Sequence, residues 1–379
     1  MQLTEATLQS GGDILALTTA AGERLRFHAV WLRDNAQEDW ARDPGNGQKL
    51  TTLADLPKDC RLSDATLEGK SVTVTFAADD RKARFDGDWL AAHAYDRPQP
   101  REAGRLPEGA KAWDNALSDD LPSSDLAALQ DRGEALRSWL AALRRYGVAK
   151  VTGLRKEPGA LFDVVDLFGH VRETNYGRHF EVRTEVNPVN LAYTGLGLQA
   201  HTDNPYRDPQ PTVQVLCCLE NSAEGGDSMV VDGFAAARRL QQEDPRGFDL
   251  LSQHCARFSY TGSAGVALHA RRPLIELSPD GVLQAVRFNA RSAAPFTDVP
   301  FDRMADYYAA YRRFAAIIDD EAMQVRFKLA PGEGFVVDNT RVLHARKGYS
   351  GSGTRWLQGC YADKDGILST LAALEGAAA

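Results

Sequence analysis

The segment AHTDNPYRDP, residues 200–209, places a histidine and an aspartate two positions apart. In an extended strand, residues i and i+2 project from the same face, so His201 and Asp203 can point together into the interior of a β fold. Imidazole and carboxylate groups are both good metal ligands. With eight histidines in the chain, an H-x-D pair arises by chance about half the time. The pair therefore needs a third ligand before it is informative.

The third candidate is His344, in VVDNTRVLHARKGY (336–349). Two neutral imidazoles and one carboxylate form the facial triad of non-haem Fe(II) oxygenases, which leaves three coordination positions open for co-substrate and O₂. The set contains no cysteine, which favours Fe(II) over structural zinc. Arg355 follows at the start of a strand-like run, and a guanidinium there can hold a carboxylate through two parallel hydrogen bonds. Its alternative interpretation is a surface salt bridge.

Composition narrows the class of protein. The chain has 379 residues, 43% of them hydrophobic and 25% charged, values typical of a globular enzyme of two domains. A net charge of −8 argues against a nucleic-acid or anionic membrane surface. No apolar run has the length of a membrane span, the N-terminus lacks the features of a secretion signal, and the five cysteines show no C-x-x-C spacing. We therefore expect a cytoplasmic protein that acts on a small molecule.

The first hundred residues predict a small β-rich domain. ILALTTAAGERLRF (14–27) and SVTVTFAADDRKARF (71–85) each read as a hairpin. Each hairpin leads into a copy of R-F-x-x-x-W-L, which suggests internal symmetry with Trp31 and Trp89 as core residues. We expect an N-terminal domain over 1–97, a linker rich in proline and charge over 98–122, and a catalytic domain over 123–379.

The catalytic domain is predicted to be mainly β. The pattern predicts helices over 123–147, ending at Gly147, and over 301–318. It predicts strands over 212–220, 228–234, 273–277, 334–345 and 355–363. Because strands dominate and do not alternate regularly with helices, a double-sheet β barrel with flanking helices fits better than a parallel α/β sheet.

Four segments resemble a known family: H-T-D (201–203), GGDSMVVDGF (225–234), DNTRVLHAR (338–346) and RWLQGCYAD (355–363). They are similar to the taurine-dioxygenase superfamily of Fe(II)/2-oxoglutarate oxygenases, in the γ-butyrobetaine hydroxylase branch, which includes trimethyllysine hydroxylase. The resemblance extends over nearly the whole chain. It implies a double-stranded β-helix (jelly-roll) catalytic domain and a homodimer. It assigns iron to His201, Asp203 and His344, the C5 carboxylate of 2-oxoglutarate to Arg355, and a further 2-oxoglutarate contact to Ser228.

The resemblance also sets the expected cofactors. They are Fe(II), 2-oxoglutarate as co-substrate and O₂, with ascorbate supporting activity in vitro. Family members with a zinc-binding N-terminal domain carry C-x-C-x-x-C directly after WLRDN. Here WLRDN (31–35) is followed by AQEDWA (36–41), which has no cysteine. We therefore expect no zinc.

In this branch the substrate is a small zwitterion with a trimethylammonium group. A quaternary ammonium donates no hydrogen bond, so aromatic faces hold it through cation–π attraction. The matching motifs assign this aromatic cage to Tyr176, Phe180 and Tyr193; the alternative is that each is an ordinary core aromatic. The resemblance assigns the substrate's anion to Asn190 and Asn289.

Arg287 and Arg291 flank Asn289, and in an extended segment all three share one face. Two guanidiniums suit a phosphonate better than a carboxylate, although either arginine can instead form a structural salt bridge. The favoured substrate is thus 2-(trimethylamino)ethylphosphonate, hydroxylated next to phosphorus. γ-Butyrobetaine, which would give L-carnitine, comes second and trimethyllysine third. A non-catalytic quaternary-ammonium binding protein is the alternative of another class, and a metal hydrolase would lack the role for Arg355.

Overall fold

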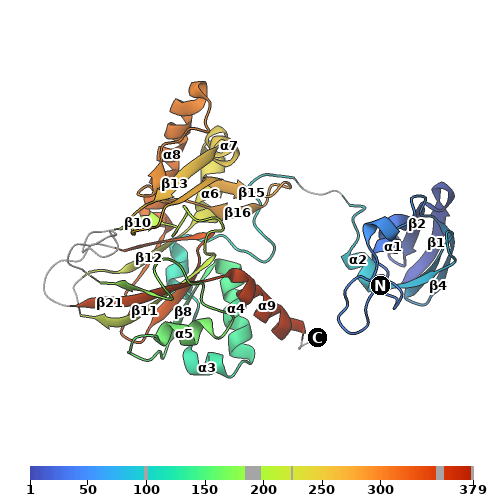
Figure 1. The fold of residues 1–379 in the computed structure, drawn as a ribbon, viewed down its shortest axis with the longest axis horizontal. Coiled ribbons are helices and arrows are strands. Elements are labelled where there is room, and N and C mark those ends of the chain that lie inside the picture. The colour runs from blue at the N-terminus through green and yellow to red at the C-terminus, as the bar shows by residue number, and fades with distance from the viewer. Residues whose placement is uncertain (98–100, 184–197, 223–224, 347–353, 377–379) are drawn as a thin grey trace. The chain divides into compact units, whose positions relative to one another are not determined.

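The computed structural model describes residues 1–97, 101–183, 198–222, 225–346 and 354–376. The chain separates into two compact units, Met1–Pro100 and Arg101–Ala379, shown in Figure 1. Among these described residues, no helix is both long and apolar enough to cross a membrane.

The N-terminal unit contains the same arrangement twice, three antiparallel strands followed by a short helix. Its elements are β1 (Leu3–Gln9), η1 (Ser10–Gly12), β2 (Ile14–Thr19), β3 (Arg24–His28), α1 (Ala29–Asp34), η2 (Leu53–Asp55), β4 (Leu62–Glu68), β5 (Ser71–Phe76), β6 (Lys82–Asp86) and α2 (Gly87–Ala92). The two predicted hairpins are β2–β3 and β5–β6. The first strand of each copy was not predicted. Trp31 and Trp89, from the repeated tag, pack together with ring centroids 5.6 Å apart.

The buried guanidinium of Arg33, within WLRDN, contacts the segment that follows this motif. Arg33 is 6% exposed and forms two hydrogen bonds with Asp79, at 3.0 and 2.6 Å. Its guanidinium carbon lies 4.4 Å from the ring centroid of Trp40 and 4.8 Å from that of Phe76. Trp40 belongs to segment 36–41, so an ion pair and cation–π contacts tie this segment to the second sheet.

The first elements of the second unit are η3 (Asn115–Asp120) and β7 (Ser123–Asp125). The elements that follow are α3 (Leu126–Gln130), α4 (Glu134–Tyr146), β8 (Val148–Thr152), α5 (Ala160–Val165), β9 (Phe180–Val182), β10 (Leu198–His201), β11 (Val213–Asn221), β12 (Ser228–Asp232), α6 (Gly233–Glu243), α7 (Pro245–Gln253), β13 (Cys255–Tyr260), β14 (Leu268–Pro273), β15 (Ile275–Leu277), β16 (Leu283–Val286), β17 (Ala293–Ala294), η5 (Phe301–Arg303), α8 (Met304–Asp319), η6 (Glu321–Met323), β18 (Gln324–Phe327), β19 (Gly334–Asp338), β20 (Val342–Arg346), β21 (Arg355–Ala362) and α9 (Lys364–Gly376).

Two sheets enclose the interior of this unit. One has six strands in the order β7-β8-β19-β11-β21-β9, and the other has four in the order β10-β20-β12-β18. Leu216 and Phe335 of the first sheet share one hydrophobic cluster with Val230 and Val325 of the second, so the sheets face each other. The chain crosses between the sheets from β10 to β11 to β12, and again from β18 through β21. This winding confirms the predicted jelly roll.

Helices cover the outer faces of both sheets (Figure 1). Helices α4, α5 and α9 pack on the six-stranded sheet, where Leu140 and Leu371 meet Val213. Helices α6, α7 and α8 pack over the four-stranded sheet, in a cluster that includes Phe248, Phe314 and Val231. The interior between the sheets therefore stays available for a site.

Two predicted elements are divided in the structure. The helix predicted over 123–147 is broken, because β7 pairs with β8 and the chain has a positive φ of 54° at Arg132 between α3 and α4. Gly147, with φ 72°, ends α4 as predicted. The strand predicted over 334–345 is two strands, since a turn transfers the chain from one sheet to the other. Helix α8 agrees with the prediction over 301–318, apart from a 3₁₀ first turn.

Candidate metal centre

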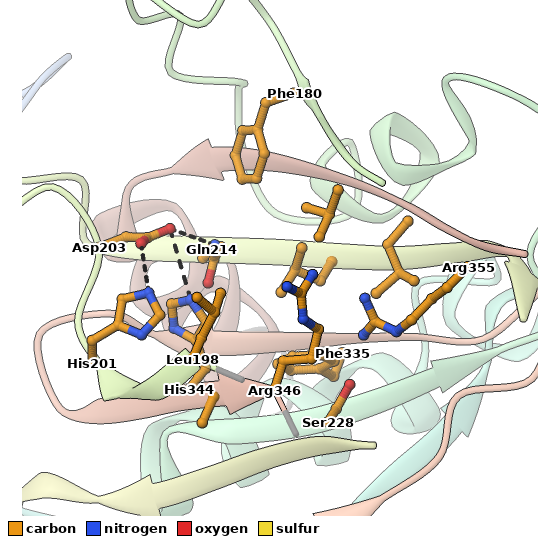
Figure 2. A pocket seen from close by; sticks show the side chains of 14 residues that line it. Phe180, Leu198, His201, Asp203, Gln214, Ser228, Phe335, His344, Arg346 and Arg355 are labelled. Atoms are coloured by element: carbon orange, nitrogen blue, oxygen red, sulfur yellow. Dashed lines mark hydrogen bonds and ion pairs between the residues drawn. The ribbon is translucent and has the colours of Figure 1, made fainter. Parts of the chain in front are cut away.

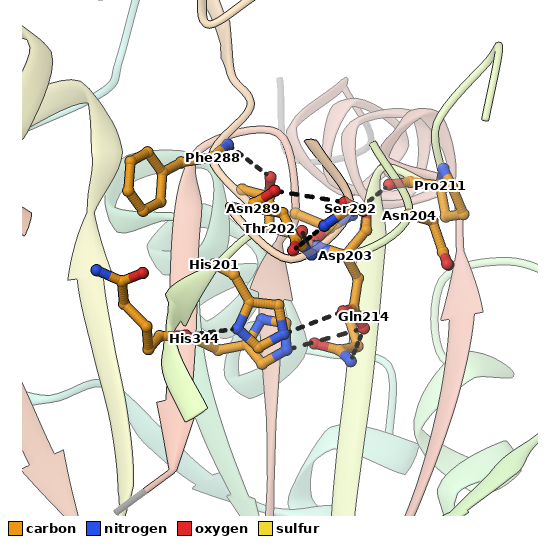
Figure 3. A network of polar contacts seen from close by, with 12 residues as sticks. His201, Thr202, Asp203, Asn204, Pro211, Gln214, Phe288, Asn289, Ser292 and His344 are labelled. Carbon is orange, nitrogen blue, oxygen red and sulfur yellow. Dashed lines mark hydrogen bonds and ion pairs between the residues drawn. The ribbon is translucent and has the colours of Figure 1, made fainter. Parts of the chain in front are cut away.

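The two histidines are brought together by strand pairing. His201 is the last residue of β10, and His344 is the middle residue of β20, directly opposite it in the antiparallel register. Asp203 lies just past the end of β10, where Asn339 binds its backbone. The Asn339 Oδ1 accepts from the Asp203 amide at 2.7 Å, and its Nδ2 donates to the Asp203 carbonyl at 2.9 Å. One ligand atom from each of His201, Asp203 and His344 lies within 4.8 Å of the others (Figure 3).

The protonation states suit a divalent metal. His201 Nδ1 donates to the Gln199 carbonyl at 2.8 Å, which directs Nε2 toward Asp203 Oδ1 at 3.3 Å. Burial lowers the pKa of His344 to about 3, so its imidazole is neutral. Burial raises the pKa of Asp203, but the adjacent imidazoles of His344 and His201 outweigh it and hold that pKa well below its usual range. Two neutral imidazoles and one carboxylate are the forms that bind metal, so these residues fit Fe(II).

The carboxylate of Asp203 is held by two further donors. Gln214 Nε2 donates to Asp203 Oδ2 at 2.6 Å, and the Tyr361 hydroxyl donates to the same oxygen at 2.8 Å. Oδ1 remains on the side of His201. Neither residue was predicted from the sequence. Tyr361 lies six positions after Arg355, on the same strand face, so strand periodicity could have indicated that it points into the site.

Arginines lie at the other end of the same pocket. Figure 2 shows His201, Asp203 and His344 at one end and Arg355 toward the other. Arg355 is 7% exposed, and its Nε donates to the Gly226 carbonyl at 3.1 Å. Ser228, the first residue of β12, also lines the pocket. A dicarboxylate that chelates a metal with one end meets a guanidinium and a hydroxyl with the other.

Arg346 is a second pocket guanidinium, which the sequence analysis missed. It lines the pocket, is 5% exposed and pairs in register with Ser228 across the four-stranded sheet. Because it follows His344 by two positions on β20, its side chain projects from the same face. The rule that linked His201 with Asp203 was sufficient to find it.

An aromatic wall begins beside the metal ligands. We use this name for Tyr176, Phe180, Tyr206, Tyr260 and Tyr361. The Phe180 ring centroid lies 5.2 Å from that of Tyr361 and 6.3 Å from that of Tyr176. Tyr260 lies 5.8 Å from Tyr176 and 5.0 Å from Tyr206. The structure thus brings together the predicted Tyr176 and Phe180 and adds Tyr206, Tyr260 and Tyr361, which were not predicted. Predicted cage residue Tyr193 lies outside the described residues.

Hydrogen bonds fix the hydroxyl groups of this wall. Tyr176 and Tyr206 share a hydrogen bond of 2.9 Å between their hydroxyls, and Tyr206 donates to Asn204 Oδ1 at 2.6 Å. Asn204 follows the H-T-D motif directly and has a positive φ of 53°. Burial raises the pKa of Tyr176 and of Tyr206, so both hydroxyls stay protonated. The wall is therefore neutral, polarisable and rigid.

The predicted anion residues are not arranged as the sequence suggested. Strand β16 ends at Val286, and residues 289–292 form a turn in which the Ser292 amide donates to the Asn289 carbonyl, so 287, 289 and 291 do not share a strand face. Arg287 pairs with Glu276 at 2.5 Å, the structural salt bridge that had been the alternative. Asn289 is buried and donates to the Thr202 carbonyl at 3.2 Å (Figure 3). Asn190 lies outside the described residues.

Arg291 differs from Arg287 in having no such partner. Its side chain is exposed, and none of the ion pairs found among the described residues includes it. Partial burial lowers the pKa of its guanidinium, while the charge of Asp203 raises it. The positive charge of Arg291 also contributes to the lowered pKa of His344. Arg291 is therefore a cation near the metal ligands.

Two histidines, one aspartate and a distant guanidinium in one jelly-roll pocket define a 2-oxoglutarate-dependent dioxygenase that uses Fe(II). A sequence model of the taurine catabolism dioxygenase TauD, TfdA family matches residues 111–361, and the chain belongs to this family. Because this is a family of dioxygenases, the chain is neither of the two alternatives considered from the sequence, a non-catalytic binding protein or a metal hydrolase.

The relatives place the chain in the γ-butyrobetaine dioxygenase branch of the family. The γ-butyrobetaine dioxygenase of Pseudomonas sp. (strain AK-1) is 34% identical over 98% of this chain and 96% of that protein. The mitochondrial trimethyllysine dioxygenase of Rattus norvegicus is 31% identical over 91% of this chain and 82% of its own. Among solved structures, asparagine oxygenase (AsnO) is 18% identical, with a TM-score of 0.49 over 62% of this chain and 82% of that one.

Proposed function

We propose that this enzyme hydroxylates an aliphatic CH₂ group of a small trimethylammonium zwitterion. One O₂ is consumed for each substrate. One of its oxygen atoms enters succinate as 2-oxoglutarate loses CO₂, and the other becomes the hydroxyl group of the product. The observation that carries the proposal is the aromatic wall, which begins at Tyr361 beside Asp203. The names of the relatives, γ-butyrobetaine dioxygenase and trimethyllysine dioxygenase, support the same substrate class.

The wall suits a quaternary ammonium for a physical reason. Such a cation cannot donate a hydrogen bond, and it gains about 2 kcal/mol from a desolvated aromatic face. Phe180 offers a face with no polar atom, while the hydroxyls of Tyr176 and Tyr206 bind each other. A primary ammonium would lose its water ligands there with no acceptor of full charge in the wall. The wall therefore favours a fully methylated nitrogen.

Each group of residues has a distinct task in this proposal. His201, Asp203 and His344 would hold the iron, and Arg355 with Ser228 would hold the distal carboxylate of 2-oxoglutarate. Iron with 2-oxoglutarate and O₂ supplies the oxidant that breaks the C–H bond. The aromatic wall and the anion contacts, acting on the two ends of the substrate, select the carbon that reacts.

γ-Butyrobetaine, giving L-carnitine, is now the first candidate substrate. Arg287 is committed to Glu276, which removes one of the two guanidiniums that had favoured the phosphonate. Asn289 has one amide hydrogen remaining for a substrate carboxylate after its bond to Thr202. The relatives that are named γ-butyrobetaine dioxygenase also support γ-butyrobetaine as the substrate.

2-(Trimethylamino)ethylphosphonate remains the second candidate, on account of Arg291. This guanidinium lies near the metal ligands and is exposed. A second negative charge on the substrate would give Arg291 an ionic partner.

The resemblance also predicts a homodimer. Light scattering on the purified enzyme tests this prediction.

A parallel turnover assay tests the proposal. Purified enzyme receives Fe(II), ascorbate, O₂ and 2-oxoglutarate with γ-butyrobetaine, 2-(trimethylamino)ethylphosphonate or trimethyllysine. Succinate and a product with one added oxygen atom are followed by mass spectrometry. We expect turnover of γ-butyrobetaine. Succinate formation that none of the three stimulates would leave the oxygenase chemistry intact and remove the trimethylammonium substrate.

A further inference from the structure

Tyr361 belongs to two parts of the site at once. Its hydroxyl donates to Asp203 Oδ2 at 2.8 Å, and its ring lies 5.2 Å from that of Phe180 with an interplanar angle of 33°. Its side chain is 5% exposed. One residue therefore contacts a metal ligand with its oxygen and forms part of the aromatic wall with its ring.

Gln214 contacts the same carboxylate oxygen without entering the wall. Its Nε2 donates to Asp203 Oδ2 at 2.6 Å, and it is 2% exposed. Gln214 on β11 and Tyr361 on β21 are directly opposite each other in the strand register. The pair thus provides two donors to one atom, of which only Tyr361 also contacts an aromatic neighbour in the wall.

This arrangement separates the two oxygens of the carboxylate. Oδ2 accepts from both donors and lies 3.8 Å from His344 Nε2, whereas Oδ1 lies 3.3 Å from His201 Nε2 and accepts from neither donor. Oδ1 would therefore be the more available oxygen for a metal, and ligation through it alone would leave coordination positions for the co-substrate and O₂. Outer donors of this kind fix the orientation of a metal-binding carboxylate and its donor strength.

We propose that Tyr361 is a positioning residue that transmits occupancy of the aromatic wall to Asp203. The inference rests on the proposed function, because it requires a trimethylammonium group against the wall. A cation at the ring face draws electron density from the phenol and polarises its O–H bond. The hydrogen bond to Oδ2 would then strengthen, and Asp203 would donate less charge to a metal that it holds. Tyr361 would in this way make the donor strength of Asp203 depend on whether substrate is bound.

The test compares Tyr361→Phe with Gln214→Met, since each variant removes one donor from the same oxygen. The visible charge-transfer absorption of the Fe(II)–2-oxoglutarate complex is recorded without O₂ while γ-butyrobetaine is added, and calorimetry measures γ-butyrobetaine binding separately. Both variants should bind Fe(II) about tenfold more weakly, in line with the loss of an outer donor. The substrate-induced shift of the absorption band should persist in Gln214→Met and be lost in Tyr361→Phe, although both still bind γ-butyrobetaine.

A second measurement uses the wild-type enzyme and so does not depend on a variant that folds. The carbon isostere of γ-butyrobetaine, 5,5-dimethylhexanoate, has the same shape and the same carboxylate, but an uncharged tert-butyl group replaces the trimethylammonium group. At saturation it should shift the band less than γ-butyrobetaine does. An equal shift would overturn the electrostatic transmission.

The remaining outcomes separate the inference from the proposed function. A band shift in Tyr361→Phe as large as that of the wild type, or an equal loss in both variants, overturns the role of Tyr361 alone. If calorimetry detects no binding of any trimethylammonium compound to the wild type, the proposed function fails and the transmission fails with it.

Discussion

The metal end of the site, His201, Asp203 and His344, and its proposed anion end, Asn289 and Arg291, are built in different ways. At the metal end, the two histidines face each other across two hydrogen-bonded strands, and Asn339 holds the backbone of Asp203 through two hydrogen bonds. At the proposed anion end, both residues lie in the turn region that follows strand β16. Strand pairing fixes a ligand side chain closely, whereas a turn permits substitutions and shifts. The proposed function thus assigns the metal to paired strands and the choice of substrate anion to a turn.

The largest effect is expected at the metal end. His344→Ala should abolish stoichiometric Fe(II) binding and lower kcat about 1,000-fold or more, because a lost ligand costs several kcal/mol of charge stabilisation. Bound iron and succinate formation are measured in parallel. His269→Ala, which changes an exposed histidine on β14, is the control and should keep both. Full iron content in His344→Ala would show that the metal lies elsewhere.

The next effect concerns 2-oxoglutarate. Arg355→Gln should raise the KM for 2-oxoglutarate about 10- to 100-fold, as expected for a lost charged hydrogen-bonding partner. The KM for the trimethylammonium substrate should change little. Arg326→Gln, at a surface ion pair with Glu321, serves as the control. If Arg355→Gln instead raised the KM of the amine substrate alone, the assignment of the two ends would be reversed.

A smaller effect should separate the two arginines of the anion end. Arg291→Gln should lower kcat/KM for the phosphonate about tenfold and for γ-butyrobetaine less, since a partly exposed charge contributes about 1 kcal/mol. Arg287→Gln should leave this ratio unchanged, because Arg287 is paired with Glu276. Competition between the two substrates gives the ratio directly. A change in the ratio for Arg287→Gln would mean that this ion pair opens when substrate binds.

The smallest effect lies in the N-terminal unit. Asp79→Ala leaves the Arg33 guanidinium buried without its carboxylate, and should lower the free energy of unfolding of this unit by about 2 kcal/mol. Asp59→Ala, at an exposed pair with Arg61, should lower this free energy much less, because water and salt screen the pair. Denaturant unfolding followed by tryptophan fluorescence measures both. Equal losses would show that the buried pair adds no more than a surface one.

The difference between residues on paired strands and residues in a turn also explains which site residues could be predicted from the sequence. The spacing of His201 and Asp203, the position of His344 after a β-rich run and the placement of Arg355 all follow strand periodicity, and the structure brings these residues into one pocket. Periodicity could also have pointed to Arg346 and Tyr361, which lie at even spacing from His344 and Arg355.

Two residues of the wall and the ion pair of Arg287 could not be predicted from periodicity. Tyr206 and Tyr260 come from segments far apart in the chain and meet only through tertiary packing. Arg287 appeared available to a substrate because its partner Glu276 lies eleven positions earlier, across the β15–β16 pair. The helix break at Arg132 depends on the pairing of β7 with β8, a contact that no local pattern encodes.

Recognition of the positive charge of the substrate by the aromatic wall is tested by one comparison. The kcat/KM of the wild-type enzyme is measured in competition for γ-butyrobetaine and for its carbon isostere 5,5-dimethylhexanoate, which lacks the positive charge. We expect a preference of about 30-fold for γ-butyrobetaine, the equivalent of about 2 kcal/mol of cation–π attraction. Equal kcat/KM values would show that the wall selects the shape of the substrate and not its charge.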